Sequence, residues 1–194
     1  MLTLYHSQPS RSTSIMQLLH ELGALDQVKI VDVTINRPDG SGQADPKNPH
    51  PEGKVPYLVD GDDHLRERMA ITLYLTDRFD DGRLGRPVGH PQRGEYLSWL
   101  FWSQGVLEPL VFLNMAKVDH PLLKAWILDL DTAIQRLDEV LSKQPYLMGD
   151  AFSAVDLALG GYFVRFKSDV PTTPAIDDWA ARCMDRDSVR AFAI

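Results

Sequence analysis

The stretch Gly53–Leu75, GKVPYLVDGDDHLRERMAITLYL, carries the signals for three consecutive elements of structure. Val55–Val59 is rich in β-branched and aromatic residues and predicts a strand, which the acidic turn Gly61–Asp63 joins to a shorter strand at His64–Arg66. Apolar residues then recur at helical spacing from Glu67 onward. We therefore expect a hairpin that is followed directly by a helix.

Pro56 stands at the entrance of the first of these strands, where its missing N–H does least damage to a sheet. A proline at such a junction is a candidate for a cis peptide bond. With a cis bond, the backbone N–H and C=O of Val55 would stay outside the sheet and could pair with an extended peptide ligand. The Val55–Pro56 element is therefore a candidate binding element.

The residues before this stretch predict a βαβ unit. Leu2–Tyr5 alternates like a short strand, Ile15–Leu22 has its apolar residues on one helical face, and Val28–Val33 is a second strand. Such a unit pairs its two strands in parallel. At most one irregular helix fits into residues 36–53, which contain Pro38, Gly40, Gly42, Pro46, Pro49, Pro51 and Gly53.

The second half of the chain predicts helices alone. Residues 80–89 are charged and rich in glycine and proline, and they mark a domain boundary. Beyond them the apolar spacing is helical, at Tyr96, Trp99, Leu100, Leu107, Leu110, Leu123, Trp126, Ile127, Leu130, Ile134, Leu137, Leu141, Leu157–Phe166, Ile176, Trp179, Ala180 and Cys183. The expected fold class is α/β plus all-α, with an α/β domain at 1–79, a linker at 80–89 and an all-helical domain at 90–194.

Two local features refine the helical half. Pro109 lies inside an apolar helical pattern and should kink that helix, because it removes a hydrogen bond to Gly105. Ser153 and Asp156 have the spacing of a capping box, with Ser153 at the N-cap and Asp156 three residues on. We interpret this box as a structural helix start.

Composition excludes several classes of function. The 194 residues carry 20 Lys plus Arg against 27 Asp plus Glu, a net charge of −7 that does not favour nucleic acid or anionic lipid. One cysteine, Cys183, excludes an intrachain disulfide, and the spacing of the six histidines does not predict a metal site. The N-terminal residues do not resemble a secretory signal and no stretch is long and apolar enough to span a membrane, so we expect a cytoplasmic protein.

Three weaker features, taken together, point to a site for a peptide that carries an anion. The first is the loop with Ser7, Ser10 and Ser12, which precedes a helix whose N-terminus stabilises anions, thiolates included. The second is the Val55–Pro56 element. The third is the helix start at Glu67-Arg68, where backbone N–H groups can hold a carboxylate and Glu67 can hold an ammonium group.

With these features in this order, the sequence resembles the cytosolic glutathione transferases, over essentially the whole chain. The resemblance is carried by LYHSQPSRS at Leu4–Ser12, the stretch Gly53–Leu75, MGDAFSAVDLAL at Met148–Leu159 and the helix that contains Trp179. It implies a thioredoxin-like N-terminal domain of β-α-β-α-β-β-α order with a cis proline, followed by an all-helical domain. The serine loop looks like that of bacterial, theta- or delta-type members.

The resemblance also implies roles for individual residues toward glutathione. The Ser7 hydroxyl would donate to the glutathione sulfur, with Ser10 and Ser12 as alternatives. Lys54 or His50 would meet the glycyl carboxylate, and Val55, next to Pro56, would pair with the cysteinyl backbone. Glu67 and Arg68 would hold the γ-glutamyl end. Arg68 departs from the family, where Ser or Thr is usual, and Asp187-Ser188 replaces the usual Arg-Pro pair of the last helix.

The expected function is conjugation of the glutathione thiolate to a small apolar electrophile by a homodimer, with glutathione as co-substrate and no metal. The electrophile would lie between the two domains, against helix residues Val106, Leu107, Leu110, Val111 and Phe112. Two alternatives stay open: a non-catalytic binding or scaffold protein of the same fold, and a glutathione-dependent reductase. The reductase is less favoured, because no cysteine lies near residues 7–14.

Overall fold

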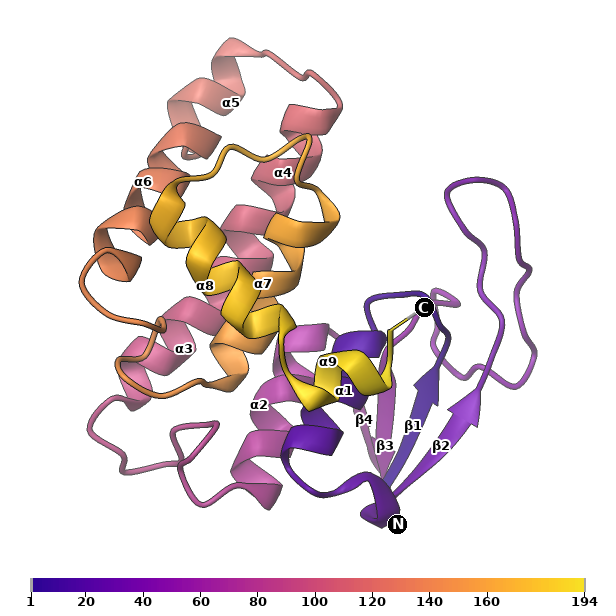
Figure 1. Cartoon of the computed structure of the whole chain (residues 1–194). Coiled ribbons are helices and arrows are strands. Elements are labelled where there is room, and N and C mark those ends of the chain that lie inside the picture. The colour runs from indigo at the N-terminus through magenta and orange to yellow at the C-terminus, as the bar shows by residue number, and fades with distance from the viewer. Residues whose placement is uncertain (1, 194) are drawn as a thin grey trace. The chain divides into compact units, whose positions relative to one another are not determined.

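The computed structural model describes residues 2–193, which divide into two compact units (Figure 1). The first unit runs to Asp81 and also includes the chain from Asp187 onward, whereas the second is Gly82–Arg186. The last helix, α9 (Asp187–Ala191), thus lies in the first unit, although the sequence analysis assigns its residues to the helical domain. Among the described residues, no helix is both long and apolar enough to cross a membrane.

The first unit is built on a four-stranded sheet of order β2-β1-β3-β4. The strands are β1 (Leu2–His6), β2 (Val28–Asp32), β3 (Tyr57–Asp60) and β4 (Asp63–Leu65). β1 pairs with β2 in parallel and with β3 antiparallel, and β3 forms the hairpin with β4. The expected strands and their pairings are confirmed, with ends that differ by one or two residues.

Helices α1 (Thr13–Glu21) and α2 (Arg68–Phe79) of this unit contact each other, and a short 3-10 turn, η1 (Leu25–Gln27), leads into β2. The core-facing side chains of the two helices are Ile15, Leu18, Leu19, Ile71 and Leu75. Helix α9 packs on α1, where the Ser188 hydroxyl donates to Glu21 Oε1 at 2.6 Å.

The segment between β2 and β3, residues 33–56, contains no helix in the structure. The order β-α-β-α-β-β-α, which implies a second helix in this segment, is therefore wrong for this chain. The prolines of this segment have no backbone N–H to donate, and each restricts the backbone conformation of the residue before it. Together these effects prevent a continuous helical turn. The segment instead forms turns, one of which closes between Arg37 and Ser41 through a backbone hydrogen bond of 2.9 Å.

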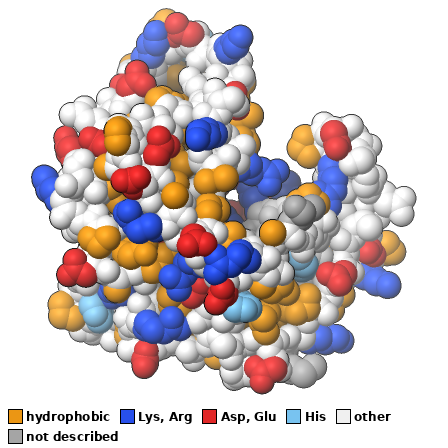
Figure 2. Space-filling view, viewed as in Figure 1, with side chains coloured by type: hydrophobic (Ala, Val, Ile, Leu, Met, Phe, Trp, Pro, Cys, Tyr) orange, Lys and Arg blue, Asp and Glu red, His pale blue; other side chains and the backbone are white. Residues whose placement is uncertain are grey.

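The second unit consists of helices throughout its regular structure, as expected. They are α3 (Arg93–Trp102), η2 (Ser103–Leu107), α4 (Glu108–Met115), α5 (Pro121–Trp126), α6 (Leu130–Leu141), α7 (Ala154–Arg165) and α8 (Pro174–Met184). η2 is a π-helical turn that directly precedes α4, and Pro109 lies in the first turn of α4. On the face seen in Figure 2, acidic, basic and hydrophobic side chains are interspersed.

The Asp156 carboxylate joins three segments of the helical unit. It is fully buried at the start of α7, where Oδ2 accepts the Ser153 N–H at 2.9 Å and the Ser153 hydroxyl at 2.6 Å. Oδ1 accepts the Leu147 N–H and the Trp179 indole N–H of α8, each at 2.9 Å. Burial raises the pKa of this carboxyl group, and the hydrogen bonds oppose that rise. The capping box is confirmed, and its Asp156 carboxylate also binds α8 through Trp179.

Asp156→Ala should lower the free energy of unfolding by about 3–5 kcal/mol, because it leaves several buried donors without an acceptor. The matched control is Asp129→Ala, since Asp129 caps α6 through the Thr132 N–H but at an exposed position. Loss of that exposed cap should lower the free energy of unfolding much less than loss of Asp156. Urea-induced unfolding measures both, and equal losses would contradict the role given to Asp156.

Candidate functional site

The Ser12 hydroxyl organises the loop between β1 and α1. Its Oγ lies 2.7 Å from His6 Nδ1 and 2.7 Å from Ser10 Oγ. It also accepts the Ser7 backbone N–H at 3.2 Å and lies 3.3 Å from the Ser7 carbonyl oxygen. A hydroxyl has one proton and two lone pairs, and Ser12 is fully buried. Its hydroxyl therefore has no capacity left for a ligand.

Ser7 and Ser10 differ from each other in what their hydroxyl groups already bind. The Ser10 oxygen accepts the Ser12 backbone N–H at 3.0 Å and shares a hydrogen bond with the Ser12 hydroxyl. The Ser7 oxygen accepts one hydrogen bond, from Arg37 Nη2 at 3.3 Å. Within the described part of the chain, no protein acceptor is recorded for the Ser7 hydroxyl proton. Of the three serine hydroxyls, that of Ser7 has the fewest partners in the folded protein.

The Arg37 guanidinium, which the sequence analysis does not single out, holds the same loop. Nη1 donates to the Pro9 carbonyl oxygen at 2.5 Å, and Nη2 donates to the Gln8 carbonyl oxygen at 3.2 Å as well as to Ser7. The Gln8–Pro9 peptide bond is cis. No sequence spacing connects Arg37 with a loop about thirty residues earlier, so only the folded structure reveals this contact.

His6 is a buried histidine at the end of β1, with 4 % of its surface exposed. Burial lowers the pKa of its imidazole, whereas the charge of Asp32, its partner in the strand register, raises it. Since burial is the larger effect, the neutral ring that hydrogen-bonds Ser12 is favoured in the folded state.

The Val55–Pro56 peptide bond is cis, which confirms the expectation for this element. Both residues are buried, and the pairing of β3 with β1 begins only at Tyr57. The backbone of Val55 thus lies ahead of the sheet ladder rather than within it.

His50 and Lys54, which are expected to meet the glycyl carboxylate, differ in their contacts and exposure. The His50 Nδ1 atom accepts the Glu52 backbone N–H at 3.0 Å, and its ring lies 5.3 Å from that of Tyr57. Partial burial is the main cause of the lowered pKa of His50. Lys54 is exposed and forms an ion pair with Glu52 at 3.3 Å. The Lys54 ammonium is therefore the more accessible group.

Glu67 and Arg68 lie at the start of α2 and occupy different environments. Glu67 is exposed and has a φ of +67°, and its carbonyl oxygen accepts the first backbone hydrogen bond of the helix, from Ile71. Arg68 has only 6 % of its surface exposed. The charge of Glu67 raises the pKa of His50 against the effect of burial.

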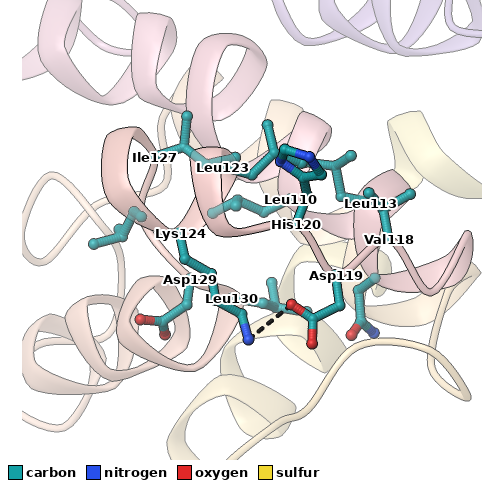
Figure 3. A pocket seen from close by; sticks show the side chains of 12 residues that line it. Leu110, Leu113, Val118, Asp119, His120, Leu123, Lys124, Ile127, Asp129 and Leu130 are labelled. Carbon is teal, nitrogen blue, oxygen red and sulfur yellow. Dashed lines mark ion pairs between the residues drawn. The ribbon is translucent and has the colours of Figure 1, made fainter.

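The helical unit contains a pocket of about 390 Å³ between α4, α5 and the start of α6 (Figure 3). Apolar side chains of Leu110, Leu113 and Leu123 form part of its wall, and an ion pair of 2.7 Å joins Lys124 to Asp119 at its edge. Among the five helix residues expected to face an electrophile, Leu110 alone lines this pocket. Leu107 and Val111 are fully buried in the core.

Cys183 is not a reactive thiol in this fold. It is fully buried in α8, and burial raises its thiol pKa strongly. Helix α7 lies directly over it, since a Cβ at Gly160 would come within 2.7 Å of the Cys183 Cβ. The chain itself therefore supplies no exposed thiol.

Comparison with known proteins supports the resemblance. The family model for the glutathione S-transferase N-terminal domain matches residues 1–77, and that for the C-terminal domain matches residues 122–192. An uncharacterized GST-like protein of Streptococcus mutans is 27% identical over 164 residues, which cover 73% of this chain and 60% of that protein. The chain thus spans less than two thirds of the length of this relative.

Two further similarities are informative. The disulfide-bond oxidoreductase YfcG of Escherichia coli is 30% identical over 159 residues, covering 70% of this chain and 69% of that protein. A sphingomonad glutathione S-transferase, solved in complex with glutathione, superposes with a TM-score of 0.73 at 25% identity, covering 97% of this chain and 96% of that one. The chain belongs to the glutathione S-transferase family.

The lowered pKa of His6 predicts a loss of stability in mild acid. The unfolded histidine takes up a proton near pH 6.5, whereas the folded one does so only at lower pH. The free energy of unfolding should therefore fall as the pH drops below about 6.5, by at most about 1.4 kcal/mol per pH unit for this group.

The variant His6→Asn keeps a polar atom near Ser12 but does not titrate, so its stability should fall less steeply between pH 6.5 and 5. Urea-induced unfolding at several pH values measures both slopes. His50, whose pKa is also lowered, contributes equally to both proteins. Identical slopes would show that His6 is not the group responsible.

Proposed function

We propose that the protein is a glutathione transferase that joins the glutathione thiolate to a small apolar electrophile. The observation that carries the proposal is the Ser7 hydroxyl: of the three serine hydroxyls in the loop it has the fewest protein partners, and its one partner, Arg37, can only donate to it. A hydroxyl that lies between the end of β1 and the N-terminus of α1 can donate a hydrogen bond to an anion and so stabilise it.

The peptide part of glutathione would be held by the other elements of the first unit. The Val55 backbone, ahead of the sheet ladder, would pair with the cysteinyl residue. The Lys54 ammonium, with His50 beside it, would meet the glycyl carboxylate. Glu67 and Arg68, at the start of α2, would hold the amino and carboxylate groups of the γ-glutamyl end.

The chemistry requires a thiolate. An ordinary thiol has a pKa of about 8.5 and is mostly protonated at pH 7. The hydrogen bond from Ser7 and the N-terminus of α1 favour the anion, and a pKa lowered by about two units corresponds to only about 2.7 kcal/mol. The thiol proton goes to solvent, the sulfur forms a bond to the electrophilic carbon, and the leaving group departs with its electron pair. Ser7 donates a hydrogen bond and is not a nucleophile.

A homodimer in the cytoplasm, where reduced glutathione is abundant, is part of this proposal. Its first competitor is a non-catalytic protein that binds glutathione without turnover. A second competitor is disulfide reduction, which the name of the Escherichia coli relative suggests. Since Cys183 is buried, both thiols for such a reaction would come from glutathione, which would be oxidised to its disulfide as the substrate is reduced. Parallel assays with a model electrophile and a model disulfide distinguish the two reactions.

Glutathione should raise the melting temperature of the protein. At 100 times its Kd, a ligand adds about 2.7 kcal/mol of stability. For a chain of this size that corresponds to a rise of roughly 5–10 °C in Tm. The control is free cysteine at the same concentration, which has the thiol but not the rest of the peptide. No rise at several concentrations of glutathione would contradict the proposed function, and a rise without turnover would support the non-catalytic competitor.

Ser7→Ala should lower kcat with a model electrophile and leave the Kd of glutathione nearly unchanged, because the peptide is held elsewhere. Loss of one hydrogen bond to a charged group costs about 1.5–3 kcal/mol, or roughly a tenfold to 150-fold drop in rate. The apparent pKa of the rate should rise. Steady-state kinetics across pH and calorimetric binding measure these quantities.

Ser14→Ala is the matched control, since Ser14 lies in the same segment and its hydroxyl donates to the Arg11 carbonyl oxygen at an exposed position. It should keep the kinetics of the wild type. If Ser10→Ala raised the pKa of the rate while Ser7→Ala did not, the assignment of the thiol-binding serine would be wrong.

A further inference from the structure

Arg37 lies in a hydrogen-bonded turn with Ser41, and from this turn its side chain reaches the serine loop. Its backbone N–H donates to the Ser41 carbonyl oxygen at 2.9 Å, and its own carbonyl oxygen accepts the Gly40 N–H at 3.0 Å. Asp39 holds the turn from the side, since its carboxylate accepts both the N–H and the hydroxyl of Ser41. At Gly42, which has a φ of +75°, a Cβ would collide with the Ile35 carbonyl oxygen. These contacts fix the backbone from which the Arg37 side chain extends.

The guanidinium is held in one orientation by three oxygens. It donates to the carbonyl oxygens of Gln8 and Pro9 and to the Ser7 hydroxyl, over distances of 2.5 to 3.3 Å. Guanidinium donors lie in one rigid plane, so three partners in a single loop fix both the arginine and the loop. A lysine, with one nitrogen on a flexible stem, could not reproduce this arrangement.

The contact with Ser7 determines which way the serine hydroxyl can point. A guanidinium is a donor only, so it occupies a lone pair of the Ser7 oxygen and cannot accept its proton. The proton must therefore point away from Arg37. A donor that is itself bonded to a cation is also polarised, which strengthens the hydrogen bond that it gives to an anion.

We propose that Arg37 is a positioning residue that acts through Ser7: it fixes the serine hydroxyl with its proton directed at the glutathione sulfur and so favours the thiolate. This inference rests on the proposed function. The Arg37 donors that face the loop are bonded to Ser7, Gln8 and Pro9, and the proposal gives Arg37 no role in binding the peptide. Its loss should change the ionisation of bound glutathione and not the affinity.

The test measures the ultraviolet absorbance of the thiolate of bound glutathione as a function of pH. Four proteins are compared: wild type, Arg37→Met, Ser7→Ala and the double variant. Arg37→Met should raise the thiol pKa by about one unit, lower kcat/KM about tenfold below that pKa, and change the Kd of glutathione less than about twofold. In the Ser7→Ala background the same change should add no further shift, because coupled residues are not additive.

Lys47→Met is the matched control, because it removes one positive charge from the same segment at an exposed position. It should leave the thiol pKa unchanged. Arg37→Gln, which keeps one amide donor, should give a smaller shift than Arg37→Met and serves if the latter does not fold. Circular dichroism checks the fold of each variant.

Each outcome has a separate meaning. An equal shift in Lys47→Met, or a full shift from Arg37→Met in the absence of the Ser7 hydroxyl, would overturn the inference, as would an unchanged pKa in both Arg37 variants. A wild-type protein that binds no glutathione would overturn the proposed function and the inference with it. A wild-type protein that forms the thiolate, with Arg37 variants that form it equally well, would overturn the inference alone.

Discussion

The hydrogen bond between the Ser12 hydroxyl and the His6 imidazole is the contact on which the proposed site depends. It joins the last residue of β1 to the residue that precedes α1 and so closes the loop between them. Because both groups are buried, loss of the Ser12 hydroxyl would leave the His6 ring and the Ser7 N–H without this partner. The Ser12 hydroxyl also accepts the Ser7 backbone N–H, so this buried pair helps to position the Ser7 backbone.

Much of the fold follows from local signals in the sequence. The hairpin and the helix after it were predictable because the run Val55–Val59 and the turn at Gly61 specify two short strands within a few residues. The capping box at Ser153 and Asp156 is equally local, although nothing in the sequence shows that Trp179 donates to the same carboxylate. The helix implied between β2 and β3 was wrong, because the prolines of this chain outweigh the family pattern.

The site was predictable only in part. The sequence offers three serines of one loop as candidates, but it cannot rank them, since the rank depends on which hydroxyl groups the folded protein already satisfies. The Ser12 hydroxyl forms a hydrogen bond with His6, whereas the Ser7 hydroxyl accepts one from Arg37. Arg37 could not be found at all, because its contact joins segments about thirty residues apart and no periodicity or motif connects them. Contacts of this kind are determined by tertiary structure.

The position of α9 has a consequence for biosynthesis. The first unit is discontinuous in the chain: its sheet and two main helices come first, but α9, which packs on α1, is translated after the entire helical unit. A domain folds as a unit during synthesis once its residues have left the ribosome. The helical unit, which is contiguous, can therefore complete its contacts first. The face of α1 that α9 covers stays uncovered until residues 187–191 have left the ribosome.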